Sequence, residues 1–256
     1  MPLQIGIVLL GATISLPYAI DVSSDYLPWI SLFVIVSFFT GLILGKLLGI
    51  HRRVAFLLSS GAAICGGTAM AAVAPIIKAK PQELLIAMTI VFLLNAIAII
   101  LFPIIGEYLE MTNFEFGAWS ALAIHDTSSV IGSATIFSNE SAQVAATLKL
   151  GRTVWLIPLL LIANWLFNKQ TEVTKFPLFI IFFILAIIAN TIFDFNEEAI
   201  NNFQLISKGF LLVGLFCIGS QFDTNELKSL SGKPLILALI IWAAVIPSAY
   251  FLVKYF

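Results

Sequence analysis

Long apolar runs alternate with short polar connectors from the start of the chain to its end. A transmembrane helix needs about 20 mostly apolar residues, and about nine runs approach or exceed that length. They cover residues 3–20, 28–49, 54–77, 84–106, 116–137, 142–167, 176–195, 203–221 and 234–253. The runs are continuous, whereas a transmembrane barrel would show alternating segments of ~10 residues. We therefore expect an all-α polytopic membrane protein in which residues 1–256 form a single transmembrane domain.

The composition supports this class. Hydrophobic residues make up 60% and charged residues 11% of the chain, against roughly 45–50% and 25% in soluble domains. A soluble fold cannot bury that much apolar surface, so we expect a lipid bilayer around the protein. The net charge of −1 gives no basic field for nucleic acid. Cys65 and Cys217 both lie in apolar runs and form neither a disulfide framework nor a zinc motif. We expect no cofactor or metal.

The charged connectors leave two topologies open. Lysine and arginine concentrate in cytoplasmic loops, which places the connector after residues 28–49 in the cytoplasm. If every run spans the membrane, seven loop cations lie inside and three outside. If the runs 54–77 and 116–137 are hairpins that return to their starting side, nine lie inside and one outside. The charge rule favours the two hairpins by a margin of two lysines, Lys78 and Lys80.

Both of these runs are interrupted by small or polar residues at their middle, Gly66-Gly67-Thr68 in one and His125–Ser129 in the other. Half-helices of ~11 residues rise about 16 Å, half of the hydrocarbon thickness. Each tip would then lie near the midplane, where irregular backbone is tolerated only if it is buried or lines a cavity. The run 3–20 also resembles 203–221, in the opposite direction. Together these features predict a secondary transporter built from inverted repeats.

His125 and Asp126 are the strongest candidates for function. An ionised aspartate at the bilayer centre costs several kcal/mol, so its default interpretation is functional. Histidine titrates near physiological pH, and the two residues could form a proton-coupling pair. The structural alternative is that both residues cap the second half-helix and form hydrogen bonds to their neighbours, since Asp, Thr and Ser are all favourable at an N-cap. Both interpretations can hold together.

The glycines and the cations suggest an anion site. A half-helix that begins near Thr68 would present unpaired N–H groups and the positive end of its dipole, although Gly66 and Gly67 could equally serve close helix packing. Lys149 and Arg152 lie one turn apart on one helix face. They could attract an anion, pair with Asp126, or snorkel to water.

Other polar residues carry less information. Asn95 and Gln221 are more typical of contacts between helices than of ligand binding, and Lys208 of the membrane interface. Ser128 and Ser129 beside His125 and Asp126 invite a hydrolase interpretation. Residues so close in sequence cannot all take triad roles without a particular turn, and no separate oxyanion device is visible. We therefore expect a protein that is not an enzyme.

Three motifs, in this order along the chain, resemble those of the YeiH-like family of proposed sulfate exporters: GAAICGGTAMAAVAPIIKAK, AIHDTSSVIGSA and TLKLGRTVWLIPL. Those proteins are bacterial inner-membrane proteins, so the resemblance implies a multi-pass transporter of that membrane. Relatives usually carry glutamine where this chain has Ser129, and one or two further hydrophobic segments before the stretch that matches residues 3–20. The resemblance highlights the following residues: Cys65, Gly66, Gly67, Ala69, Pro75, His125, Asp126, Lys149 and Arg152.

We therefore expect secondary transport of a small anion, sulfate or a sulfonate, coupled to protons or sodium, by a homodimer. The anion would bind between the two tips, with Lys149 and Arg152 raising the local positive potential. The alternatives are a cation/proton antiporter that uses Asp126, a channel, and a membrane protein that binds a ligand without transporting it. The residues expected to bind the anion are Cys65, Gly66, Gly67, Thr68, Asp126, Thr127, Ser128, Ser129, Lys149 and Arg152.

Overall fold

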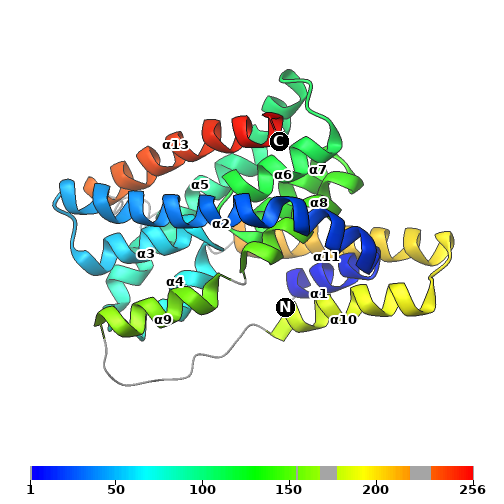
Figure 1. The fold of residues 1–256 in the computed structure, drawn as a ribbon, viewed down its shortest axis with the longest axis horizontal. Helices are drawn as coiled ribbons and strands as arrows, with labels where there is room; N and C mark the ends of the chain where they lie inside the picture. The colour runs from blue at the N-terminus through cyan, green and yellow to red at the C-terminus, as the bar shows by residue number, and fades with distance from the viewer. Residues whose placement is uncertain (1, 154, 168–177, 220–231, 256) are drawn as a thin grey trace.

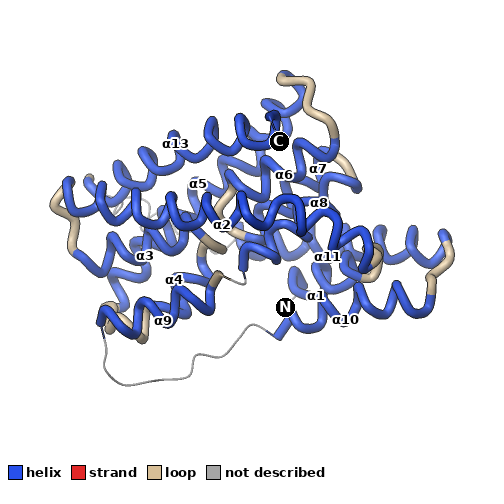
Figure 2. Tube along the Cα trace, in the orientation of Figure 1, coloured by secondary structure: helices blue, strands red, loops and turns tan. Residues whose placement is uncertain are grey.

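The computed structural model describes residues 2–153, 155–167, 178–219 and 232–255. Every regular element in these ranges is a helix (Figure 2), which confirms an all-helical fold. Four helical stretches in them are long and apolar enough to cross a membrane, fewer than the runs counted in the sequence. They are Tyr26–Leu47, Pro81–Tyr108, Asn139–Phe167 and Lys233–Tyr255. Among the described residues the remaining apolar runs form shorter or interrupted helices, except for the helix Glu197–Gly219, which has 23 residues and begins with a polar stretch.

The first two runs have other boundaries than the sequence suggested. Helix α1 covers Pro2–Gly11 and α2 covers Leu16–Leu47, so the expected polar connector at residues 21–27 is helical. The break falls at residues 12–15 because Pro17 suits the first turn of a helix, where its missing N–H is no loss. The N–H of Leu16 is instead bonded to the Thr191 hydroxyl, at 2.7 Å. That partner is 175 residues away and cannot be seen in local sequence.

The run 54–77 folds back on itself as a first hairpin, which we define as residues 52–79. Helix α3 (Arg52–Ala63) leads to the tip, and α4 (Gly67–Val73) with the turns after it returns. The two ends meet through His51, before α3, and Glu83, in the first turn of α5 (Pro81–Tyr108), whose Nδ1 and Oε1 atoms lie 3.1 Å apart. A spanning segment would separate these residues by the whole membrane, so the all-spanning topology is wrong for this run.

The run 116–137 forms a second hairpin, residues 113–137, from α6 (Asn113–Ala123) and α7 (Thr127–Phe137). Phe116 near the start of α6 stacks on Phe137 at the end of α7, with ring centroids 4.0 Å apart. Just beyond α7, the Ser141 hydroxyl donates to the Asn113 carbonyl at 2.7 Å. The end of this hairpin therefore returns to its beginning.

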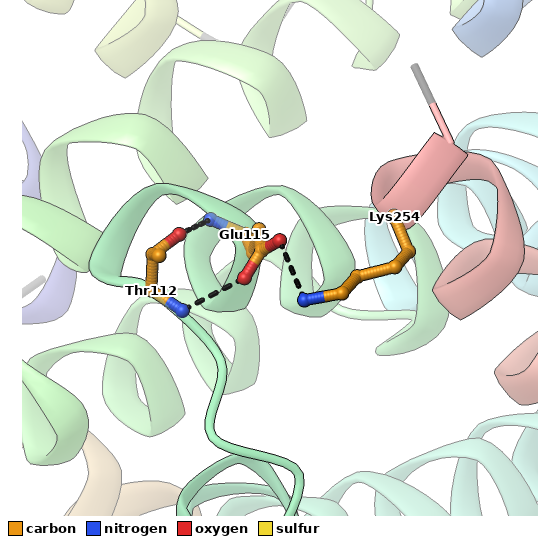
Figure 3. Close-up of polar contacts among 3 residues, drawn as sticks. All are labelled: Thr112, Glu115 and Lys254. Carbon is orange, nitrogen blue, oxygen red and sulfur yellow. Dashed lines mark hydrogen bonds and ion pairs between the residues drawn. The ribbon is translucent and has the colours of Figure 1, made fainter.

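The mouths of the two hairpins lie at opposite ends of the molecule. Helix α5 connects them, and its 28 residues rise about 42 Å. Helix α13 (Lys233–Tyr255) runs between the same ends. At one end Lys254 bonds Glu115 of the second hairpin at 3.0 Å, and Glu115 also closes a capping box with Thr112 (Figure 3). At the other end a Cβ on Gly49, just before the first hairpin, would lie 3.5 Å from Lys233 Nζ.

Charge is divided between these ends. The end with the mouth of the first hairpin, which we call the cationic end, carries the cations Lys46, Arg52, Arg53, Lys78, Lys80 and Lys233. The opposite, acidic end carries Glu107, Glu110, Glu115 and Glu140, with Lys254 among them. The two-hairpin arrangement thus gathers Lys78 and Lys80 with the other cations, as the charge rule favoured.

The remaining helices are α8 (Asn139–Thr153), α9 (Leu156–Phe167), α10 (Leu178–Phe193) and α11 (Glu197–Gly219). Helices α1, α10 and α11 pack together at the side opposite α3 and α9 (Figure 1). Ser207 of α11 bonds the Gly6 carbonyl of α1 at 2.7 Å. The expected counterparts 3–20 and 203–221 therefore lie side by side. The polar stretch with Gln221 lies outside the described residues, and the inverted repeat stays a prediction.

Candidate functional site

The tips of the two hairpins touch each other, as the sequence predicted. Gly66 lies at the first tip with a φ of 58°, in the left-handed region that favours glycine. A Cβ built on it would come within 3.0 Å of both Cα and Cβ of Asp126, at the second tip. The contact is between backbones, so no flexible side chain can move aside. Gly66 is therefore required both for its conformation and for the approach of Asp126.

Asp126 forms the N-cap of α7. Its backbone is extended, and its Oδ2 accepts the N–H of Ser128 at 3.0 Å and, more weakly, that of Ser129 at 3.4 Å. The capping alternative for Asp126 is thus confirmed. The N–H groups that an anion would use at the start of α7 are already bonded to a carboxylate. In the first hairpin, Gly66 provides no side-chain cap for the short helix α4.

Arg152 of α8 joins the two hairpins. Its guanidinium donates to the carbonyls of Ala62 and Ala63 at 2.8 and 2.6 Å, at the end of α3. It also donates to those of Ala121 and Leu122 at 3.1 and 2.9 Å, at the end of α6. These carbonyls belong to the last turns of helices, where no intrahelical partner is available. One side chain therefore satisfies the C-terminal ends of both half-helices.

Lys149 acts on the second hairpin alone. Its Nζ donates to the Ile124 carbonyl at 2.7 Å and to that of Ala121 at 3.4 Å. Lys149 and Arg152 are 0% and 1% exposed, so the snorkelling alternative is wrong. Because helix C-termini carry partial negative charge, two cations there are electrostatically favourable. The sequence placed both cations correctly beside the tips but could not identify these carbonyl partners, which lie 25 to 90 residues away along the chain.

The middle of helix α5 contacts both tips. Asn95 Oδ1 accepts the N–H of His125 at 3.2 Å. One turn earlier the Phe92 ring lies against the first tip, 2.8 Å from a Cβ built on Gly67. Asn95 Nδ2 and His125 Nδ1 are fully buried and have no hydrogen-bond partner among the described residues. Asn95 was interpreted as a contact between helices, and the structure adds that this contact is made with the tip itself.

Two tryptophans hold the second hairpin against α13. The indole N–H of Trp242 donates to the Ala123 carbonyl at 3.3 Å, beside the tip. That of Trp119, within α6, donates to the Ile246 carbonyl of α13 at 3.1 Å. Phe102 of α5 stacks on Trp119 with ring centroids 4.3 Å apart. The second hairpin is therefore fixed along its length by its neighbours.

The predicted site residues gather around the tips but differ in access. Cys65 and His125 are completely buried, at 0% and 1% exposed. The stretch 126–129 is also buried, at 6–9% exposed. Thr68 is half-buried on α4. Of the residues that the resemblance highlighted, Ala69 is buried and Pro75 is exposed after α4, away from the tips.

The tips carry more positive than negative charge. Lys149 and Arg152 contribute two formal positive charges, and Asp126 contributes one negative charge. The contacts between basic and acidic side chains of described residues are His51–Glu83 and Lys254–Glu115, so neither buried cation takes part in one. In the same part of the chain, no group of three His, Cys, Asp or Glu side chains is arranged to hold a metal ion.

Comparison with known proteins identifies the family. The profile of the family described as conserved hypothetical protein 698 matches residues 1–238. A UPF0324 membrane protein of Bacteroides thetaiotaomicron is 38% identical over 249 residues, which is 95% of this chain and 74% of the relative. One of Shewanella oneidensis is 38% identical over 255 residues, 99% of this chain and 80% of the relative.

A third relative, a UPF0324 membrane protein of Geobacter sulfurreducens, is 36% identical over 245 residues, 96% of this chain and 79% of the relative. No solved structure matches the chain. The names of these relatives state a membrane location and no activity. The chain thus belongs to the conserved hypothetical protein 698 (UPF0324) family of multi-pass membrane proteins, the YeiH-like group that its motifs resemble.

Proposed function

We propose that this protein is a secondary transporter that moves a small anion, sulfate or a sulfonate, across the bacterial inner membrane. The observation that carries the proposal is the contact between Gly66 and Asp126, at the tips of hairpins that enter from opposite ends. Secondary transporters bind substrate where interrupted helices meet near the midplane. Asn95, the fifteenth of the 28 residues of α5, contacts the second tip, which is therefore about equally far from both ends.

The charge at the tips favours an anion over a cation. A buried charge needs a partner, because desolvation penalises it heavily. Lys149 and Arg152 outnumber the single carboxylate of Asp126, and helix C-terminal carbonyls compensate them only in part. A bound monovalent anion, or a divalent one with a proton, would neutralise the remainder. A cation/proton antiporter would instead place its substrate beside two fixed positive charges.

Asp126 suggests how a proton would be coupled to the anion. Its ionised carboxylate occupies the N–H groups of Ser128 and Ser129 and repels a second anion. A protonated Asp126 is a weaker acceptor, so an oxyanion can replace it at the positive end of α7. The proton and the anion would then bind together. His125 is the second member of the proposed proton-coupling pair, with the unpartnered Nδ1 as its proton-accepting atom.

The cationic end is proposed to face the cytoplasm, because lysine and arginine concentrate on that side. In this orientation the first hairpin enters from the cytoplasm and the second from outside. The start of α7 would then lie near the middle of the membrane, since the second tip is about equally far from both ends. Substrate would reach it from either side as the hairpins alternate their exposure.

The test is uptake of labelled sulfate into proteoliposomes, with and without an imposed pH gradient. Wild type, Asp126→Asn and Glu115→Gln are reconstituted in parallel. Glu115 is a matched control because it is a capping carboxylate at the other end of the same hairpin. We expect saturable uptake driven by the gradient in wild type and in Glu115→Gln. Asp126→Asn, which imitates the protonated carboxyl, should still bind sulfate but lose the dependence on the pH gradient.

Two results contradict the proposal. Uptake by Asp126→Asn that follows the pH gradient as in wild type removes the coupling role. Folded wild type that transports sodium but neither sulfate nor a sulfonate removes the anion and favours the cation/proton antiporter.

A further inference from the structure

A groove of about 430 Å³ lies at the cationic end, away from the tips. It forms where the end of α2, the start of α3 and the end of α9 come together, at the same side of the molecule in Figure 1. Its volume falls within the range of small-ligand pockets, about 300–1,000 Å³. The lining residues are Leu42, Lys46, Ile50, Arg52, Ala55, Phe56 and Leu166.

Two exposed cations, Lys46 and Arg52, lie on this groove. The Arg52 guanidinium also lies over the Phe167 ring of α9, 4.5 Å from its centroid, which fixes the position of its charge. Among the described residues neither cation forms an ion pair with a carboxylate. Arg52 begins α3, whose first turn has no side-chain cap from His51, so free N–H groups add to the positive potential.

The rest of the groove is apolar, and so are the exposed surfaces beside it. Phe56 and Ala55 are buried beneath it. On the adjoining surfaces, Ile43 and Leu47 of α2 are 59% and 77% exposed, and Trp165 of α9 is 82% exposed. Helix α2 is one of the membrane-spanning helices, and exposed tryptophan is typical of the membrane interface. The groove therefore combines a cationic edge at the interface with apolar walls at the depth of the acyl chains.

We propose that this groove binds an anionic phospholipid. Its phosphodiester lies between Lys46 and Arg52, and its acyl chains lie along the exposed faces of α2 and α9. Basic pockets between transmembrane helices on the cytoplasmic side are typical of such headgroup recognition. A zwitterionic lipid carries an ammonium group that these cations repel. A soluble phosphate compound would leave the apolar walls without a partner. The site is independent of the transport function proposed above.

The test uses the full chain, purified in detergent and freed of bound lipid. Binding of dioleoylphosphatidylglycerol, dioleoylphosphatidylcholine and glycerophosphate is titrated and counted by native mass spectrometry. We expect wild type to bind one phosphatidylglycerol in preference to phosphatidylcholine. Each cation near a lipid headgroup contributes about fivefold in affinity, so Lys46→Gln/Arg52→Gln should bind phosphatidylglycerol roughly thirtyfold more weakly. Both residues are exposed, so the variant is expected to fold.

Lys78→Gln/Lys80→Gln is the matched control, since it removes two exposed cations of the same end that do not line the groove. It should bind phosphatidylglycerol as wild type does. Equal binding of the two phospholipids by wild type would overturn the proposal. An equal loss in both double variants would show that diffuse surface charge, rather than the groove, attracts the lipid. Glycerophosphate that binds as tightly as the lipid would identify a soluble anion as the occupant. Should the double variant fail to fold, Arg52→Gln alone is expected to lose about fivefold.

Discussion

Arg152 forms hydrogen bonds to both hairpins, which lie far apart along the chain. The strength of this connection can be measured with Arg152→Lys. Lysine keeps the charge but offers one nitrogen, whereas the guanidinium uses three nitrogens to reach four carbonyls. We expect about two of the four hydrogen bonds to be lost. At ~0.6 kcal/mol each, the average between membrane helices, the loss is ~1 kcal/mol. The penalty for leaving buried carbonyls unpaired raises it to ~3 kcal/mol at most.

The assay is equilibrium unfolding in detergent micelles, followed by tryptophan fluorescence. Trp119 of the second hairpin bonds α13, and Trp242 of α13 bonds the second hairpin, so both indoles report on the separation of the two. Arg53→Lys is the matched control, because it makes the same exchange at the mouth of the first hairpin, where the side chain is half-buried. We expect Arg152→Lys to unfold ~1–3 kcal/mol more easily and the control to stay within ~0.5 kcal/mol of wild type. Equal stability of Arg152→Lys and wild type would refute the assignment of Arg152 as the connection between the hairpins.

Three further predictions concern the tips and the mouth of the second hairpin. Gly66→Ala should lower the free energy of unfolding by ~1–3 kcal/mol or prevent folding, because it adds both backbone strain and a 3.0 Å contact with Asp126. The control Gly151→Ala should not destabilise the protein, because a Cβ at that position meets nothing within 4 Å. A Gly66→Ala variant as stable as wild type would contradict the tip contact. Asn95→Leu leaves the buried N–H of His125 without its acceptor and should cost ~1–3 kcal/mol in the same assay; an unchanged midpoint would show that the bond is absent. The backbone N–H of Thr112 donates to Glu115 and Lys254 lies beside the carboxylate, and both hold the pKa of Glu115 below its ordinary value of 4.5. The carboxylate therefore stabilises the fold above pH 4.5, and this contribution is lost as pH falls through the lowered pKa. Glu115→Gln should accordingly melt at a lower temperature than wild type at pH 7, and this difference should shrink as pH falls through the lowered pKa; a difference that grows in acid would contradict this sign.

The sequence favoured the hairpins over spanning segments because the signals for them are local. Glycine at the first tip and capping residues at the second interrupt apolar runs that are otherwise long enough to span, and the lysines after the first hairpin break the charge rule unless the chain returns. The first two runs were misjudged because Leu16 finds its hydrogen-bond partner on α10. A polar stretch can stay helical when tertiary contacts set the helix boundary elsewhere.

The sequence identified the residues of the candidate site better than it identified the role of each residue. Burial cost indicated a purpose for Asp126 inside the membrane, whereas Lys149 and Arg152 could also have extended to water from the sequence alone. What each side chain binds depends on which carbonyls the fold brings near, and the carbonyls of Ala62 and Leu122 carry no sequence signal. Asn95 is a single amide in an apolar helix, and only its position opposite the tip distinguishes it from an ordinary contact between helices.

The opposite entry of the two hairpins is the claim on which the transport proposal depends most. It is tested by labelling single cysteines with a membrane-impermeant maleimide in right-side-out and inverted vesicles. His51→Cys and Lys80→Cys report on the mouth of the first hairpin, and Asn113→Cys and Asn139→Cys on that of the second; all four positions are exposed. Unsubstituted protein gives the background from Cys65 and Cys217. With the proposed orientation, we expect both positions of the first pair to react only in inverted vesicles and both of the second only in right-side-out vesicles. Reaction of both pairs from the same side would contradict the opposite entry, and members of one pair that react from opposite sides would contradict the hairpins themselves.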